Sequence, residues 1–221
     1  KTSCAKIFAK AVNCLHPING EPCLECDVCK GIENESIYDV TEMDAASNNA
    51  VEDIRDVLNE VNYLPVMAKY RVYIIDEVHM LSAAAFNALL KTLEEPPAHA
   101  IFILSTTEPQ KIPATIQSRC QRFDFRRLSA KNIAGRIGEI TRKDGINITA
   151  DAIQLVAQLG DGSMRDALSI LDLCSGIEGE ITREDIENTL IEGMTSQMSV
   201  SADEISEYLA DMSDEELEEI F

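Results

Sequence analysis

Two carboxylates follow a short apolar run in the stretch RVYIIDEVHML, residues 71–81. The run from Val72 to Ile75 is rich in β-branched residues and too short for an independent helix, so we interpret it as a buried strand. Asp76 and Glu77 follow at the strand end, where open parallel sheets bind their ligands. One carboxylate can hold Mg²⁺, and the other can orient or deprotonate an attacking water. A solvent-facing acidic strand end is the competing interpretation.

A second candidate for phosphate chemistry is the start of the chain, Lys1, Thr2 and Ser3, which opens a segment of helical apolar spacing. In the pattern G-x-x-x-x-G-K-[ST], backbone N–H groups cradle phosphates, Lys neutralises the β/γ oxygens and the hydroxyl binds Mg²⁺. The tripeptide is weak by itself, but with the acidic pair it indicates the end of such a motif. Because the glycine loop is missing, we expect the chain alone to be inactive, with negligible nucleotide affinity.

A third candidate site is a cluster of thiols between residues 14 and 29. Its members are Cys14, Cys23, Cys26 and Cys29. Two overlapping C-x-x-C steps and a fourth cysteine beyond a Pro/Gly-containing loop predict a tetrahedral zinc site, which is structural because no ligand position stays open. An iron–sulfur pattern would need cysteine where Glu33 stands. Unpaired buried cysteines, or His16 as a substitute ligand, are the alternatives.

Alternating elements must position these side chains. We expect a strand ending at Asp44, a helix over 51–61, a helix capped by Ser82 and stopped by Pro96, and a strand over 101–104. This alternation is typical of a parallel sheet with crossover helices. Thr106 and Thr107 follow the last strand, beside the acidic pair, and could position a water or contact a γ-phosphate; ordinary buried threonines are the alternative.

Beyond residue 127 the pattern becomes helical, at 130–141, 150–159, 164–174 and 183–190. These segments predict a small all-α domain over 128–191. Residues 192–221 hold ten acidic residues and no Lys or Arg, and we interpret them as an acidic linker and tail, or as the first helices of another domain.

Composition excludes several classes of protein. The net charge of -20 argues against a chain that coats nucleic acid, although basic residues gather locally between residues 119 and 131. No long apolar segment or basic-then-apolar leader is present, so we expect a cytoplasmic protein without membrane contact. An odd number of cysteines, 7, disfavours a disulfide framework.

The stretches DAASNNAVEDIRDVL, VYIIDEVHMLSAAAFNALLKTLEEPP, LSTTEPQKIPATIQSRCQRFDF and GDGSMRDALSILD resemble the gamma/tau clamp-loader subunits of bacterial DNA polymerase III, which are AAA+ ATPases. The resemblance runs from Lys1 to about Asp172 and includes the four-cysteine module. It implies an α/β fold of P-loop NTPase type over 1–127, with the zinc module at about 14–30 inserted, followed by an all-α lid.

The resemblance also implies roles for single residues. Lys1 and Thr2 match the end of Walker A, while Asp76 and Glu77 match Walker B. Thr107 matches sensor 1, with Thr106 a close second.

Two arginines complete the implied set. Arg119, in Ser-Arg-Cys, matches an arginine finger acting in trans, with an ordinary surface salt bridge as the alternative. Arg165, in GSMRDAL, matches sensor 2, with a helix-surface arginine paired with an aspartate as the alternative.

The function implied is ATP hydrolysis, with Mg²⁺, that loads the sliding clamp on primed DNA during replication. The implied partners are other clamp-loader subunits in a hetero-oligomeric ring, the clamp and primer–template DNA. A non-catalytic scaffold similar to the delta-prime subunit, or a zinc-stabilised interaction module, is the alternative.

Overall fold

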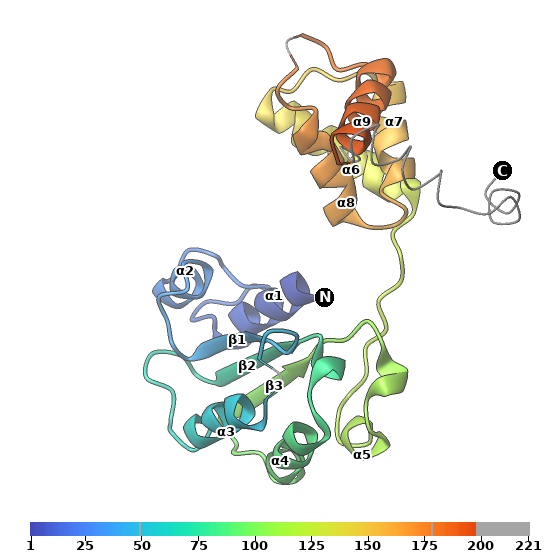
Figure 1. The fold of residues 1–221 in the computed structure, drawn as a ribbon. Helices are drawn as coiled ribbons and strands as arrows, with labels where there is room; N and C mark the ends of the chain where they lie inside the picture. The colour runs from blue at the N-terminus through green and yellow to red at the C-terminus, as the bar shows by residue number, and fades with distance from the viewer. Residues whose placement is uncertain (49, 178, 198–221) are drawn as a thin grey trace, which may run out of the picture. The chain divides into compact units, whose positions relative to one another are not determined.

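The computed structural model describes residues 1–48, 50–177 and 179–197. The chain divides into two compact units, Lys1–Phe125 and a second that begins at Arg126 (Figure 1). Among the described residues, no helix combines the length and apolar character needed to cross a bilayer.

The first unit is a parallel sheet with helices on both faces. Its strands are β1 (Val40–Asp44), β2 (Arg71–Asp76) and β3 (Ala100–Leu104), in the order β1-β2-β3. Its helical elements are α1 (Thr2–Asn13), α2 (Asp27–Glu33), α3 (Val51–Glu60), η1 (Val78–Met80), α4 (Ala83–Glu94), η2 (Pro109–Lys111) and α5 (Ala114–Gln117). Helices α1 and α2 lie on one side of the sheet, and α3 and α4 on the other (Figure 1). The predicted parallel α/β sheet is confirmed.

The middle strand contributes side chains to both faces, as alternation along a strand requires. Val72 and Ile74 pack against Ala5 and Ala9 of α1. Ile75 joins the cluster on the opposite face, which contains Ile54, Phe86 and Leu89. All of these side chains are buried, which places the end of β2 on a firmly packed strand.

A buried carboxylate fixes the entry to β2. Asp39 is 2% exposed and accepts hydrogen bonds from the backbone N–H groups of Val66, Met67 and Ala68 at 2.7–3.0 Å. Burial would raise the pKa of Asp39, but these donors outweigh it and, with the nearby charge of Arg71, hold the pKa below its usual value. The loop before β2 is thereby tied to the start of β1.

The second unit consists of α6 (Ala130–Asp144), α7 (Ala150–Leu159), α8 (Met164–Leu173) and α9 (Arg183–Gln197). The hydroxyls of Ser129, Thr149 and Ser163 cap the first three helices at their N-termini. The all-helical lid is confirmed. Helix α9 continues past Leu190, where the sequence led us to expect its end, to Gln197; the remainder of the expected acidic segment lies outside the described residues.

The first residues of the second unit are tied to the turn between α7 and α8. Arg127 Nη1 donates to the carbonyl of Asp161 at 3.0 Å and to its carboxylate, and Leu128 N donates to the carbonyl of Gly162 at 3.0 Å. Arg127 therefore lies in the second unit, although the sequence analysis assigned it to the end of the first.

Candidate functional site

The candidate nucleotide site is built at the carboxyl end of β2, where α1 meets the acidic pair. Thr2 is the first residue of α1, and its hydroxyl donates a hydrogen bond to Oδ2 of Asp76. Oδ1 of Asp76 accepts the backbone N–H of Glu77 at 3.0 Å. Nζ of Lys1 donates to the carbonyl of Thr106 at 2.6 Å. Residues 74 or more positions apart in sequence thus meet at one edge of the sheet.

Ser3, the third residue of the same opening tripeptide, is exposed in the first turn of α1. Among the described residues its hydroxyl has no hydrogen-bond partner, so the geometry gives it no contact with the acidic pair. Cys4, the next residue, is also exposed.

Glu77 bends the chain away from β2. Its backbone is left-handed, with φ 44° and ψ 44°, a conformation that costs a non-glycine residue about 1–2 kcal/mol. Oε2 of Glu77 accepts hydrogen bonds from the backbone N–H and the hydroxyl of Thr107, each at 3.0 Å. The bend directs the carboxylate to the end of β3, and such strain at a strand end is typical of functional positions.

The two threonines after β3 have different partners. Thr107 contacts Glu77, whereas Thr106 Oγ1 lies 3.0 Å from Nδ1 of His79 and accepts the backbone N–H of Glu108 at 2.9 Å. Nδ1 of His79 lies 3.2 Å from Oε2 of Glu77. The structure therefore brings Lys1, Thr2, the acidic pair and both threonines together.

Sequence reasoning missed His79. A signal was present, because His79 follows Glu77 by two residues in the same stretch, on the short helix η1. It also missed Glu108, a residue with no motif of its own. A hydrogen bond from Lys111 lowers the pKa of Glu108.

Arg119 lies just beyond α5 and is bound within its own chain. Nη2 donates to Oε1 of Glu94, the last residue of α4, at 2.7 Å, and Nη1 donates to the carbonyl of Thr115 at 2.7 Å. The Arg119 side chain is 33% exposed. The guanidinium thus forms the surface salt bridge that was one interpretation of this residue, and it remains accessible from solvent.

Arg165 is the second residue of α8, in the second unit, and is exposed. Within the described part of the chain its side chain has no hydrogen bond or ion pair. The pairing with Asp161 or Asp166, which was the alternative interpretation of Arg165, is not formed there, and the role of Arg165 at a nucleotide stays a prediction.

The four clustered cysteines converge. The sulfur atoms of Cys14, Cys23, Cys26 and Cys29 all lie within 4.8 Å of one another. Cys14 follows α1 directly, and Cys26 caps α2, which carries Cys29. Between them, Asn19 and Gly20 take left-handed conformations in a tight turn closed by an Ile18–Glu21 bridge, which lets the loop fold back.

Backbone hydrogen bonds to the sulfur atoms lower the pKa of two of the four thiols, which favours the thiolate form that binds metal ions. Backbone N–H groups donate to sulfur at 3.2–3.4 Å, from Cys23 to Cys14, from Cys26 to Cys23 and from Cys29 to Cys26. The first of these lowers the pKa of Cys14. Burial would raise the pKa of Cys26, but the N–H groups of Leu15 and Cys29 outweigh it and bring the pKa to about 6. Four sulfur donors at this spacing fit a tetrahedral metal ion.

The fourth thiol is the buried one. Burial and the hydrogen bond with Cys26 raise the pKa of Cys29 to about 12. Metal binding would have to displace the proton of this thiol, because a thiol ligates zinc as the thiolate.

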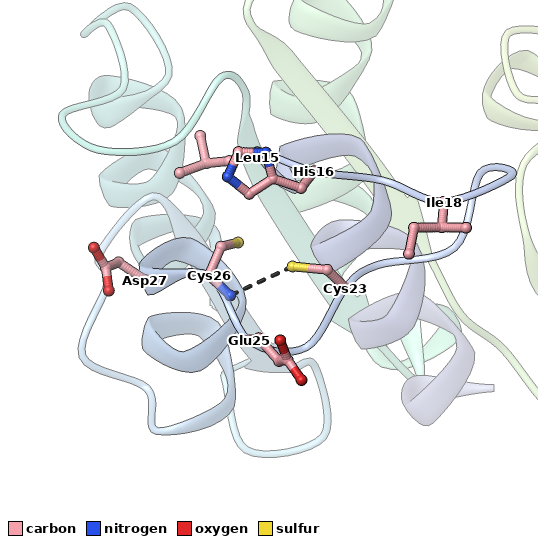
Figure 2. A pocket seen from close by; sticks show the side chains of 7 residues that line it. All are labelled: Leu15, His16, Ile18, Cys23, Glu25, Cys26 and Asp27. Atoms are coloured by element: carbon pink, nitrogen blue, oxygen red, sulfur yellow. Dashed lines mark hydrogen bonds between the residues drawn. The ribbon is translucent and has the colours of Figure 1, made fainter.

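A cavity of about 450 Å³ borders the cluster (Figure 2). Its lining consists of Leu15, His16, Ile18, Cys23, Glu25, Cys26 and Asp27. His16 is exposed and is not among the grouped ligands, so the four-cysteine set, without a histidine, is the one that the geometry favours.

Comparison with solved structures supports the fold. The chain is similar to the RuvB Holliday junction branch migration motor of Thermotoga maritima, with a TM-score of 0.56 and 16% identity over 74% of this chain and 54% of that one. A point mutant of the same protein gives a TM-score of 0.58 at 15% identity, over 74% of this chain and 55% of that one. This likeness shows the fold, an α/β domain of the AAA+, P-loop NTPase type followed by an all-helical lid.

Sequence comparison is more specific. Residues 1–129 match the family model for the DNA polymerase III delta subunit, and residues 132–173 match that for the ATPase lid domain of the DNA polymerase III clamp loader subunit. The chain belongs to this family of bacterial DNA polymerase III clamp-loader subunits, on its gamma/tau branch.

The curated relatives are tau and gamma subunits. The chain is 56% identical to DNA polymerase III subunit tau of Bacillus subtilis over 200 residues, which are 90% of this chain and 35% of the relative. It is 47% identical to the tau subunit of Escherichia coli over 186 residues, 83% of this chain and 29% of the relative. The chain thus spans about a third of the length of these relatives.

Proposed function

We propose that the parent protein is an ATPase subunit of the sliding-clamp loader, with Mg²⁺-ATP bound at the carboxyl end of β2. The observation that carries the proposal is the hydrogen bond from Thr2 to Asp76, because it joins the first residue of a helix preceded by lysine to a buried strand that ends in two carboxylates. Hydroxyl and carboxylate oxygens are the donors that Mg²⁺ prefers, so this pair fits the ion.

Each residue then has a separate task. Thr2 and Asp76 would hold Mg²⁺, which supplies positive charge to the phosphate oxygens when bound. Lys1 would contact the phosphates, Glu77 would orient and deprotonate the attacking water, and Thr107 would fix the Glu77 carboxylate that it already contacts.

The chemistry and exposure of Arg119 support a role at the nucleotide of a neighbouring subunit. It is a permanently charged guanidinium, partly exposed on the loop after α5, and its partner Glu94 is a surface carboxylate that a phosphate can replace. We infer that it stabilises charge on ATP held by the next subunit in a ring, so that hydrolysis depends on assembly. Opening of the clamp and its loading on primed DNA would be the work that this assembly performs.

The four cysteines would hold a structural zinc ion. Thiolates suit zinc, and four protein ligands leave no position for a catalytic water. The ion would join the end of α1 to α2 and the loop between them, on the side of the sheet that also carries Thr2.

A non-catalytic scaffold is the second candidate, since residues 1–129 match the delta subunit model. ATP turnover by the full-length protein, assembled with its partner subunits, separates the two. We expect turnover that Glu77→Gln reduces by about 10²-fold or more while ATP binding persists. Equal turnover in the assemblies that contain the original protein and the Glu77→Gln variant would favour the scaffold.

A further inference from the structure

His79 lies between two glutamates in the candidate site, and every polar atom of its ring has a partner. Its side chain is 7% exposed. Nδ1 lies 3.0 Å from Oγ1 of Thr106 and 3.2 Å from Oε2 of Glu77, and Nε2 lies 3.3 Å from Oε1 of Glu108. The ring therefore connects the end of β2 with the loop after β3.

The contacts on Glu77 are distributed unevenly between its two oxygens. Oε2 faces the backbone N–H of Thr107, the hydroxyl of Thr107 and Nδ1 of His79. Oε1 has no hydrogen-bond partner among the described residues. One oxygen is thus fixed by the surroundings, and the other is left to accept a proton from water.

The backbone makes these contacts necessary. Glu77 has left β2 and is left-handed, so the pleat of the strand no longer sets the direction of its side chain. Thr107 and His79 approach Oε2 from different elements, the loop after β3 and the helix η1. Thr107 already donates twice to Oε2 from the β3 side, and His79 adds a further contact to the same oxygen from the η1 side.

The proton on the ring selects between the glutamates. In the neutral form with the proton on Nδ1, the N–H is shared between Oγ1 of Thr106 at 3.0 Å and Oε2 of Glu77 at 3.2 Å, while Nε2 faces Glu108 without a proton. With the proton on Nε2, the ring faces Glu108 with its N–H and can accept from Thr106, and Glu77 keeps the two donors of Thr107 but loses the one from the ring. Lys111 Nζ already donates to Oε1 of Glu108 at 2.7 Å, so Glu108 does not depend on the ring.

We propose that His79 is a positioning residue for Glu77: it donates its Nδ1 proton to Oε2 and so aligns Oε1 with the attacking water. The inference rests on the proposed function, in which Glu77 acts as the general base. His79 itself touches neither the nucleotide nor the water.

The test compares three variants in the full-length protein assembled with its partner subunits. His79→Phe keeps the ring and removes both nitrogens. His79→Asn places an amide nitrogen near the position of Nδ1, whereas the longer His79→Gln places one near Nε2. His16→Asn, at an exposed histidine, controls for loss of an imidazole.

We expect His79→Phe to lower kcat by about tenfold with KM within about twofold of the original, because alignment of a base affects the transition state. His79→Asn should recover most of that loss and His79→Gln should not. In ¹⁵N spectra of the ring, Nδ1 should carry the proton, and Glu77→Gln should shift its signal.

Each other outcome has a defined meaning. If Glu77→Gln abolishes turnover but His79→Phe and His79→Asn leave kcat unchanged, the role of His79 is overturned while the proposed function stands. If Glu77→Gln leaves turnover intact, the proposed function itself fails. Equal losses of kcat in His79→Asn, His79→Gln and His79→Phe, or a change in KM alone, would also overturn the positioning role of His79. If His79→Phe fails to fold, kcat of His79→Asn is compared with kcat of His79→Gln. A higher kcat in His79→Asn supports the positioning role, and equal values overturn it.

Discussion

The hydroxyl of Thr2 donates a hydrogen bond to the carboxylate of Asp76, across 74 positions of sequence. The bond joins the first residue of α1 to the last residue of β2. It sets the distance between two oxygen donors before any cation arrives, which reduces the reorganisation that Mg²⁺ binding requires.

This pair predicts a hydroxyl requirement at residue 2. In the full-length protein, Thr2→Val keeps the shape of the side chain and removes the oxygen, so Mg²⁺ activation of ATP hydrolysis should weaken by about tenfold or more. Thr2→Ser, which keeps the hydroxyl, should retain the Mg²⁺ activation. A magnesium titration of turnover measures the effect, and equal activation of the Val and Ser variants would exclude Thr2 as a ligand.

The cysteine cluster predicts about one zinc ion for each chain. Cys29→Ser should abolish stoichiometric zinc in metal analysis and lower the melting temperature by roughly 7 °C, which corresponds to about 2 kcal/mol for a unit of this size. Cys4→Ser, at an exposed cysteine outside the cluster, should change neither quantity. Full zinc content in Cys29→Ser would contradict the four-sulfur site.

The exposed guanidinium of Arg119 predicts a defect in the neighbouring subunit. Arg119→Ala subunits mixed with intact ones should bind ATP normally, and turnover at the adjacent site should fall on the order of 10³-fold. Arg122→Ala, which removes an exposed arginine paired with Asp124, is the matched control. Unimpaired turnover in the mixed complexes would reject action in trans.

Asp39 predicts a pH-dependent contribution to stability. Its pKa is lowered in the folded state, so its carboxylate stabilises the fold above the unfolded pKa of about 3.9, and this stabilisation is lost as the pH falls through the folded pKa. Asp39→Asn should cost about 3 kcal/mol at pH 7, because three backbone N–H groups lose an ionised acceptor.

The difference in unfolding free energy between the original chain and Asp39→Asn should narrow as the pH approaches 3. Urea titrations across this range measure it, with Asp56→Asn, at an exposed aspartate, as the control. A difference that stays constant down to pH 3 would show that ionisation is not its source.

Gly162 predicts a steric requirement in the second unit. Its φ is +80°, and an added Cβ would lie 2.6 Å from Cβ of Arg127. Gly162→Ala should therefore destabilise the protein by about 3 kcal/mol. Gly135→Ala, in the interior of α6 with nothing within 4 Å, should stabilise it by about 0.5–1 kcal/mol. A higher melting temperature for Gly162→Ala than for Gly135→Ala would refute the clash between residue 162 and Arg127.

Much of the fold followed from local pattern. The apolar run at 72–75 and the cap at Ser82 depend on neighbours in sequence, and both appear in the structure as expected. The convergence of the four cysteines was also predictable from their spacing, because the loop between them holds an Asn-Gly pair that favours a tight turn.

The missed contacts are long-range. His79 follows Glu77 by two residues, but that position alone does not reveal its partners Thr106 and Glu108, which come from another strand end. Likewise, the pairing of Arg119 with Glu94 requires α4 and the loop after α5 to be placed first. Such pairings depend on tertiary packing, which a local pattern does not encode.

The distribution of thiols has a practical result for spectroscopy. With zinc held by four of the seven cysteines, and with Cys174 buried and Cys120 partly covered, Cys4 is the exposed thiol that remains. A maleimide dye should therefore attach there without prior mutagenesis, two residues after Thr2. Its fluorescence would report directly on the surroundings of the first turn of α1.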